Sequence, residues 1–281
     1  MDYDTIDLKN NKATVQLRES HQVVFEATAP TISEMANLQH TITLHYKNEG
    51  WLIYKDEYQD DLAQEMGHVT KNDILKQVDK NYQAQFQSQA FTTPPQVVAP
   101  LFVQHTDNRS AAYNYAEAWA LWTNSYYPRV PSGDCASFVS QAMYAGMGFS
   151  PPNMSGMGTV GDNTQWYYNF NNNQYSSPWA GVPSQFSFLI RTGTSKKGPF
   201  GTESYSNCAV QFSDVVQIID PSAPGSNTWN HEAILVHAGN PCNYLSSKTI
   251  DAHDNDHKDY PLSNWASYTL HYILINGWYG N

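Results

Sequence analysis

The order of the predicted elements limits the possible folds of this chain more than any other feature. Two helical segments precede four strand-like runs. Alanine and aromatic residues recur on one helical face from Asp107 to about Asn124, and a second apolar helix is predicted at Ala136–Ala145. Strand-like runs follow at Val215–Ile219, Glu232–Val236, Thr249–Ala252 and Tyr268–Ile275. Helices that come before a group of strands predict an α+β fold, with the helices packed on an antiparallel sheet. Residues 148–201 are aromatic and rich in Asn and Gly, and their weak periodicity predicts a functional loop system.

The N-terminal third alternates polar and apolar residues as a strand does. Alternating runs lie at Ala13–Leu17, His21–Phe25, His40–Tyr46 and Trp51–Tyr54. The segment Lys47–Gly50 links the last two runs and predicts a hairpin. A helical stretch is predicted from about Asp56 to Gln89, and Phe91–Pro95 has the composition of a linker. We therefore expect an accessory hairpin-plus-helix α+β domain at residues 1–92, a linker at 93–106 and a catalytic domain at 107–281.

The composition excludes several classes of protein. Hydrophobic residues make up 41% of the chain and aromatic residues 14%, which excludes a disordered chain. A net charge of −11 argues against nucleic acid and against an electrostatic membrane anchor. No run approaches the roughly twenty apolar residues of a membrane span. Only 15% of residues are charged, a balance common in secreted proteins that act on cell walls. We expect a secreted or wall-associated monomer whose signal sequence has been removed.

Asp134-Cys135 lies where a turn-rich loop meets the second predicted helix. The preceding loop carries Pro128, Pro131 and Gly133, and Asp134 is a preferred N-cap residue. Cys135 is therefore expected in the first helical turn, where unpaired N–H groups and the helix dipole favour the thiolate and lower the thiol pKa. The other two cysteines, Cys208 and Cys242, are too few for a disulfide framework or a zinc site, although they can pair with each other.

A cysteine nucleophile needs a general base, and that base needs a third polar group to orient it. Among ten histidines, His231 opens a predicted strand directly after a polar loop, so that a helix packed across the sheet can bring Cys135 to it. On the next strand, Asp251 and His253 share one face, and either can orient an imidazole. The acidic segment 254–259 is expected to be a solvated loop rather than a cation site.

Aromatic residues are candidates for the walls of a substrate cleft. They are Trp166, Tyr167, Tyr168, Trp179 and Trp229.

The segment Gly133–Gln141, with the sequence Gly-Asp-Cys-Ala-Ser-Phe-Val-Ser-Gln, resembles the nucleophile motif of the bacterial putative amidase domain family. That family is distantly related to the NlpC/P60 and CHAP peptidoglycan hydrolases, which have papain-like folds. Further similar segments follow in the family's order at Trp166–Tyr168, Asp214–Gln217, His231–Val236 and His253–Asp256. The resemblance covers roughly residues 107–278. It implies a papain-like (NlpC/P60-type) catalytic core.

The resemblance also implies roles for individual residues. Cys135 would be the nucleophile, His231 the base and His253 the third polar residue, with Asp251 as the other choice. The Cys135 backbone N–H would serve in the oxyanion hole. Asp134 would help to hold substrate. Of the aromatic candidates for the cleft, we expect Trp166 and Trp229 to contact substrate as well. Related hydrolases pair this aspartate with a following serine, whereas this chain has Ala136 there, so their specificity does not transfer.

We therefore expect a cysteine amidohydrolase or peptidase that cleaves an amide bond, with peptidoglycan as the leading substrate class. The reaction would pass through an acyl-thioester that water releases. No metal or organic cofactor is expected. Two other functions remain open, namely an acyl or peptidyl transferase on the same scaffold and a non-catalytic module that binds cell wall or protein.

Overall fold

The computed structural model describes residues 2–9, 11–25, 29–47, 50–58, 102–131, 134–220 and 228–281. Its strands are β1 (Asp2–Lys9), β2 (Lys12–Val23), β3 (Ser33–Lys47), β4 (Gly50–Tyr58), β5 (Val103–His105), β6 (Tyr168–Asn169), β7 (Gln174–Tyr175), β8 (Gly198–Ser204), β9 (Val215–Ile219), β10 (His231–His237), β11 (Thr249–Ala252), β12 (Asp256–Pro261) and β13 (Thr269–Gly280). The α-helices are α3 (Arg109–Trp119), α4 (Asp134–Gly146), α5 (Ser177–Ala180) and α6 (Val182–Leu189). Short 3-10 helices lie at η2 (Leu245–Ser247) and η3 (Leu262–Trp265).

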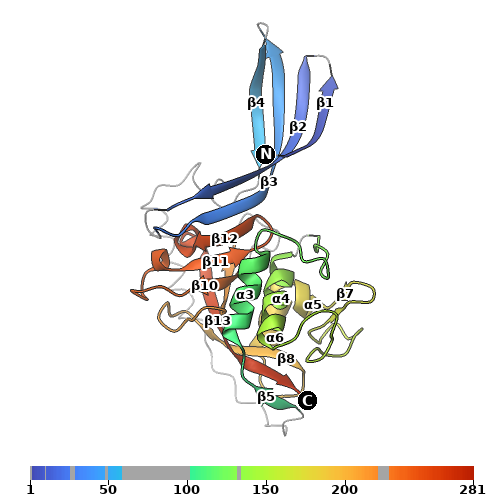
Figure 1. Ribbon diagram of the computed structural model, residues 1–281, viewed down its shortest axis with the longest axis vertical. Coiled ribbons are helices and arrows are strands. Elements are labelled where there is room, and N and C mark those ends of the chain that lie inside the picture. Colours follow the sequence, from blue (N-terminus) through green and yellow to red (C-terminus); the bar gives the residue numbers. More distant parts are fainter. Residues whose placement is uncertain are drawn as a thin grey trace.

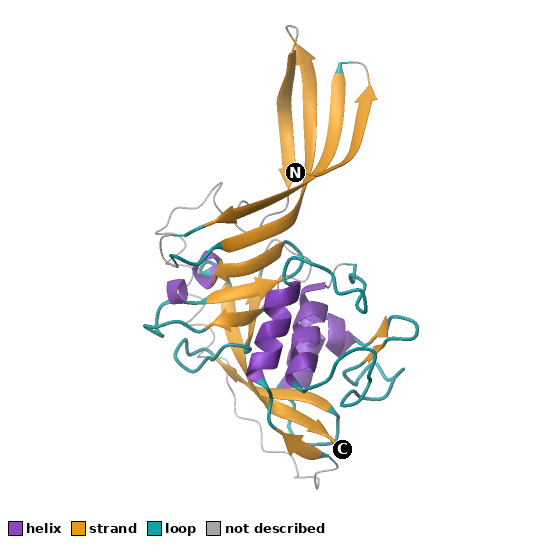
Figure 2. Ribbon diagram, in the orientation of Figure 1, coloured by secondary structure: helices purple, strands orange, loops and turns teal. Residues whose placement is uncertain are grey.

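Most strands join one antiparallel sheet, which the helices cover on one face (Figures 1 and 2). The strand order is β1-β2-β3-β12-β11-β10-β9-β13-β5, with β4 paired to β3 and β8 paired to β13. Strands β6 and β7 form a separate ribbon. The predicted α+β class is thus confirmed. The four predicted strands of the C-terminal half appear as β9, β10, β11 and β13.

The two faces of the sheet carry separate apolar clusters, as the period of two in a strand requires. On β10, Ile234 and Val236 pack toward Phe138 and Val139 of α4. Ala233 and Leu235 point to the opposite face and pack in a cluster with Trp265 of η3. A residue's position along β10 therefore decides which layer its side chain enters.

Helix α4 is buried on nearly all sides, and Asp134 through Tyr144 are all buried. The sheet covers one side, and an aromatic cluster that includes Tyr144, Trp166 and Trp179 covers another. Helix α3 is capped by Asn108, whose side chain accepts a hydrogen bond from the Ala111 N–H at 3.1 Å. It ends at Trp119, earlier than the predicted end near Asn124.

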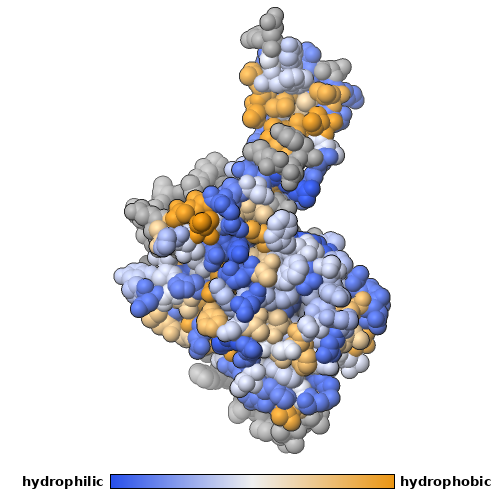
Figure 3. Space-filling view, in the orientation of Figure 1, coloured by the Kyte–Doolittle hydropathy of each residue, from blue (hydrophilic) through white to orange (hydrophobic). Residues whose placement is uncertain are grey.

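The N-terminal strands extend away from the helices while remaining joined to the main sheet (Figure 1). Strand β3 pairs with β12 near its start and with β4 near its end, so one long strand belongs to both regions. Lys47 pairs with Gly50, which confirms the predicted hairpin. Hydrophobic side chains gather on the surface of this projecting region, with Leu8 and Ile53 among the most exposed (Figure 3).

Three other predicted segments have different outcomes. Asp56–Tyr58 belongs to β4 rather than to a helix, and the rest of the predicted helix and the linker at Phe91–Pro95 lie outside the described residues. Residues 148–167 are turns and irregular loop, as predicted, whereas residues 168–201 include short helices and strands. Several aromatic side chains of this region are buried in the core. The prediction of a solvated loop at 254–259 was wrong, because Asp256–Pro261 forms β12 and Asp256 is buried.

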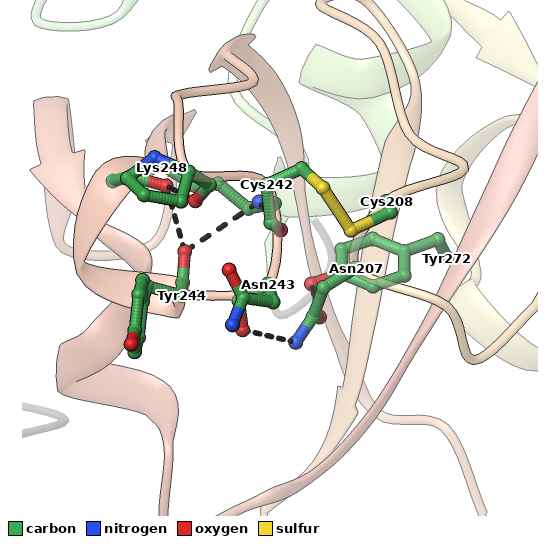
Figure 4. Close-up of a disulfide and its surroundings, with 9 residues drawn as sticks. Asn207, Cys208, Cys242, Asn243, Tyr244, Lys248 and Tyr272 are labelled. Atoms are coloured by element: carbon green, nitrogen blue, oxygen red, sulfur yellow. Dashed lines mark hydrogen bonds between the residues drawn. A yellow bond between two sulfur atoms is a disulfide. The ribbon is translucent and has the colours of Figure 1, made fainter.

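A disulfide joins Cys208 to Cys242, 34 positions apart, and this leaves Cys135 as the free cysteine (Figure 4). The bond ties the loop before β9 to the connection between β10 and β11. Nearby, the Asn207 amide donates to the Asn243 carbonyl at 3.3 Å, and the Lys248 ammonium donates to the Cys242 carbonyl at 2.6 Å. Pairing of these two cysteines, open from the sequence, is thus present in the structure.

Candidate active site

Cys135 occupies the first turn of α4, as predicted, but its thiol is buried. It packs with Ala136, Val182 and the indole of Trp229. The backbone N–H of Glu232 donates a hydrogen bond to the Cys135 sulfur. The thiol therefore lies at the start of β10, next to the residue that follows His231.

The electrostatic surroundings of this thiol differ from the expectation. Burial raises the pKa of the Cys135 thiol well above its usual range, and the negative charges of Asp254 and Glu232 raise it further. Backbone hydrogen bonds from the helix start and from Glu232 act in the opposite direction but are smaller. The predicted lowering of this pKa was wrong, because desolvation and two carboxylates outweigh the helix N-terminus. The resting side chain is a thiol.

His231 is the first residue of β10 and is partly buried. Its ring lies edge-on to Trp265, with the ring centroids 5.1 Å apart. By strand alternation it shares the face of Ala233 and Leu235, whereas Glu232 points toward α4. His231 and the thiol therefore both lie near the start of β10, although strand alternation directs the His231 ring to the face opposite α4.

Asp254 forms a hydrogen bond with the start of the cysteine helix and interacts electrostatically with His231. Its Oδ2 accepts a hydrogen bond from the Cys135 N–H at 3.3 Å. Burial raises the pKa of Asp254, and the positive charge of a protonated His231 opposes that rise. Asp254 and Asn255 are the two central residues of the turn between β11 and β12, and both have positive φ, at 64° and 83°. This left-handed conformation is uncommon outside glycine, and such strain clusters at functional sites.

His253 lies next to Asp254 in sequence but is held elsewhere. Its Nδ1 is 2.7 Å from Oδ2 of Asp134, and its Nε2 is 3.0 Å from the Trp119 carbonyl at the end of α3. Both partners are acceptors, so both bonds form when both ring nitrogens carry protons. The ring also stacks on Phe138, 4.1 Å away between centroids. The structure therefore does not bring His253 to His231 as the orienting group.

Asp134 faces the interior rather than an open cleft. Its Oδ1 accepts from the Val130 N–H at 3.0 Å, and its Oδ2 lies 3.3 Å from Arg129 besides the bond to His253. Arg129 in turn forms two hydrogen bonds of 2.6 Å with the buried carboxylate of Asp256. This network fixes the start of α4 against β12. Both Asp134 oxygens are engaged by the protein, so this side chain positions the cysteine helix, and its predicted contact with substrate stays a prediction.

Asp251, the other predicted orienting residue, points away from His231. It is fully buried, and its carboxylate meets those of Glu117 on α3 and Asp259 on β12. The prediction that Asp251 and His253 share a face is confirmed, since both contact α3 or its end.

The predicted substrate-binding tryptophans divide into two kinds. Trp166 is fully buried, donates to the Ser140 hydroxyl at 3.0 Å and packs on Trp179 in the aromatic core. Trp166 therefore belongs to the aromatic core, as do Tyr167, Tyr168 and Trp179, which are also buried. Trp229 is partly exposed, contacts the Cys135 cluster and stacks on His271 with centroids 3.6 Å apart. Only Trp229 stays a candidate for substrate contact.

The polar residues of the cysteine helix form a buried network that holds α4 in place. Gln141 accepts from the Tyr115 hydroxyl at 2.6 Å and donates to Ser137 at 3.1 Å. Ser140 donates to the Trp179 carbonyl at 2.7 Å and accepts from Gln185 at 2.8 Å. The Ser137, Ser140 and Gln141 side chains of the sequence motif thus orient the helix that carries Cys135.

Two acidic residues close to Cys135, Glu232 and Asp254, were not predicted from the sequence as neighbours of the thiol. Asp254-Asn255 between two alternating runs is a signal for a two-residue hairpin turn, which would have placed Asp254 at a strand end. Glu232 stood inside a strand-like run, and an acidic residue at a core-facing strand position is itself unusual.

The fold and site together define a class: an α+β protein with a buried thiol at the start of a helix, near a carboxylate and the first residues of β10. Residues 106–275 match the putative amidase domain family, which is more than half of the chain, and the chain belongs to that family. Membership indicates a hydrolase that acts on amide C–N bonds. No curated protein and no solved structure matches the chain significantly. None of the described helices has the length and apolar character needed to cross a bilayer.

Proposed function

We propose that this protein is a cysteine-dependent amidase with a papain-like catalytic core, in which Cys135 is the nucleophile and His231 the general base. The observation that carries the proposal is the hydrogen bond from the Glu232 N–H to the Cys135 sulfur. It brings a helix-start thiol to the first residues of β10, where His231 stands. A thiol and an imidazole at a strand end, with a nearby carboxylate, are the parts that cysteine hydrolases need.

Asp254 takes the third role in this proposal, in place of His253. Its charge interacts with that of His231, and a carboxylate beside an imidazole stabilises the imidazolium that forms when the base takes a proton. His253 acts as a positioning residue, since it links Asp134 at the start of α4 to the end of α3.

The raised pKa of Cys135 indicates the order of events. Because the resting group is a thiol, its proton passes to His231 as the sulfur attacks the amide carbonyl, and the negative charge moves to the carbonyl oxygen. His231 then gives that proton to the amine as the C–N bond breaks, which leaves an acyl-thioester on Cys135. Water attacks the thioester, gives a proton to the base and restores the thiol with release of a carboxylic acid.

The Cys135 N–H is the oxyanion-hole donor in this mechanism, yet Asp254 accepts its hydrogen bond in the resting structure. Substrate must therefore displace this contact when its carbonyl oxygen enters the site. The carboxylate then turns fully toward His231.

We propose an amide bond of peptidoglycan as the substrate and a secreted or wall-associated location. The disulfide supports this environment, because such bonds persist mainly in oxidising compartments. The low content of charged residues agrees with a protein that works on a polar polymer.

Digestion of purified peptidoglycan by the parent protein and by Cys135→Ala tests the proposal. The parent should release fragments that each carry a new amine or carboxyl group, seen by mass spectrometry as the addition of one water per cut. Cys135→Ala should release none. Equal digestion by both proteins would refute cysteine catalysis, and products that carry an added amine in place of water would indicate a transferase.

A further inference from the structure

Three carboxylates meet where α3 crosses the hairpin formed by β11 and β12. They belong to Glu117 on α3, Asp251 on β11 and Asp259 on β12, and one oxygen of each lies within 4.8 Å of the others. None of the three has a part in the proposed amide hydrolysis. Like charges this close repel one another strongly in a partly desolvated site, so the cluster needs a counter-charge.

Asp251 is the group that most requires a partner. Its side chain is fully buried, and its Oδ1 accepts the Asp259 N–H at 2.8 Å. Its Oδ2 has no hydrogen-bond partner among the described residues, and the same holds for Oε1 of Glu117, although neither atom reaches solvent. A buried carboxylate oxygen without a donor loses its hydration with no compensation.

The neighbouring charges do not balance the cluster. Lys258 lies 3.5 Å from the second oxygen of Glu117, and the Tyr113 hydroxyl also bonds to Glu117. Near Asp259, the charge of His237 is opposed by that of Glu34. One lysine therefore faces three carboxylates.

We propose that Glu117, Asp251 and Asp259 bind a calcium ion. Calcium takes oxygen ligands at about 2.3–2.6 Å, so two oxygens on opposite sides of the ion stand about 4.8 Å apart, which is the upper limit of spacing in this cluster. The set lacks the nitrogen and sulfur ligands that zinc and copper prefer. Glu117 and Asp259 are partly exposed, so an ion and its water ligands have access from solvent.

The position of this site gives the ion a structural task. Glu117 lies two residues before Trp119, and Asp251 lies two residues before His253, which bonds to the Trp119 carbonyl. The turn with Asp254 follows directly. An ion held by α3 and both strands of the hairpin would fix the turn that carries Asp254 against the helix layer.

Calorimetric titration of CaCl₂ into the chelator-treated protein tests the proposal. The parent should bind one ion per chain and melt at a higher temperature with calcium than without it. Glu117→Gln and Asp259→Asn should each weaken binding by about tenfold or more, because each removes a charged ligand. Glu57→Gln, the same chemical change on an exposed part of β4, is the matched control and should bind as the parent does.

Lys258→Met distinguishes a calcium site from a cluster whose repulsion is relieved by a proton shared among the carboxylates. Loss of the competing ammonium should tighten calcium binding, provided that the variant melts cooperatively without calcium. A parent protein that gives no heat with CaCl₂ and melts at the same temperature in chelator would overturn the proposal. Binding that persists unchanged in Glu117→Gln and Asp259→Asn would overturn it as well, because the ion would then sit elsewhere.

Discussion

The protonation state of the Glu232 carboxyl in the folded protein can be tested directly. Its carboxyl is fully buried beneath α4, and burial raises its pKa from 4.5 to about 8. The Gln217 amide donates to its Oε2, and its Oε1 has no hydrogen-bond partner among the described residues. Glu232→Gln keeps the shape and the acceptor oxygen but cannot ionise.

The expected effect is on the pH dependence of stability. Below pH 4.5 the carboxyl is protonated in both the folded and the unfolded chain, so it contributes no pH dependence. From pH 4.5 to about 8 the unfolded chain releases this proton while the folded protein retains it, so the parent loses stability as pH rises. One pH unit corresponds to about 1.4 kcal/mol, so the loss reaches at most about 5 kcal/mol.

Urea unfolding of the parent and Glu232→Gln at several pH values between 4.5 and 9 measures this effect. The variant's free energy of unfolding, relative to that of the parent, should rise by several kcal/mol up to about pH 8 and then stay level. The exposed Glu57→Gln serves as control and should follow the parent. A constant difference between Glu232→Gln and the parent across the whole range would refute the reasoning.

Three further predictions concern the disulfide, the turn and the tryptophans. Replacing both Cys208 and Cys242 by serine should lower the free energy of unfolding by about 2–4 kcal/mol in denaturant titrations, because it frees a long loop in the unfolded chain, and an unchanged midpoint would contradict this. Asp254→Asn should speed alkylation of the buried thiol, because it removes a negative charge, and should lower kcat by on the order of 10²-fold. An alkylation rate and a kcat that change by the same factor in the same direction would argue against a role for Asp254 beside the base. Trp166→Ala should destabilise the core by about 3–5 kcal/mol in thermal or urea unfolding, whereas Trp229→Ala should mainly raise KM; the reverse pattern would contradict their placement.

The sequence predicted those parts of the fold that local periodicity controls. Alternation of apolar residues located β9, β10 and β11 closely, and turn chemistry located the hairpin after Lys47. The cysteine was placed correctly because prolines, glycine and aspartate mark a helix start without any tertiary information.

Side-chain partners depend on contacts between distant segments, and there the sequence reading was incomplete. His253 had a suitable position, but it bonds to Asp134 and to the end of α3, which lie 119 and 134 positions away. The thiol pKa was expected to fall because the helix start was visible in the sequence, whereas the burial of Cys135 and the approach of Asp254 were not. Trp166 was placed in a cleft because composition cannot distinguish an aromatic core from an aromatic binding surface.

Trapping the acyl-enzyme tests the central claim most directly. The parent protein is mixed with peptidoglycan fragments, quenched in acid within the first turnover and digested, and the peptide that carries Cys135 is examined by mass spectrometry. The account predicts an acyl adduct on Cys135, and neutral hydroxylamine should remove this adduct because it is a thioester. The corresponding peptide of Cys135→Ser should carry no adduct that neutral hydroxylamine removes. Amide cleavage that proceeds in Cys135→Ala, with no adduct on Cys135 of the parent, would contradict the account.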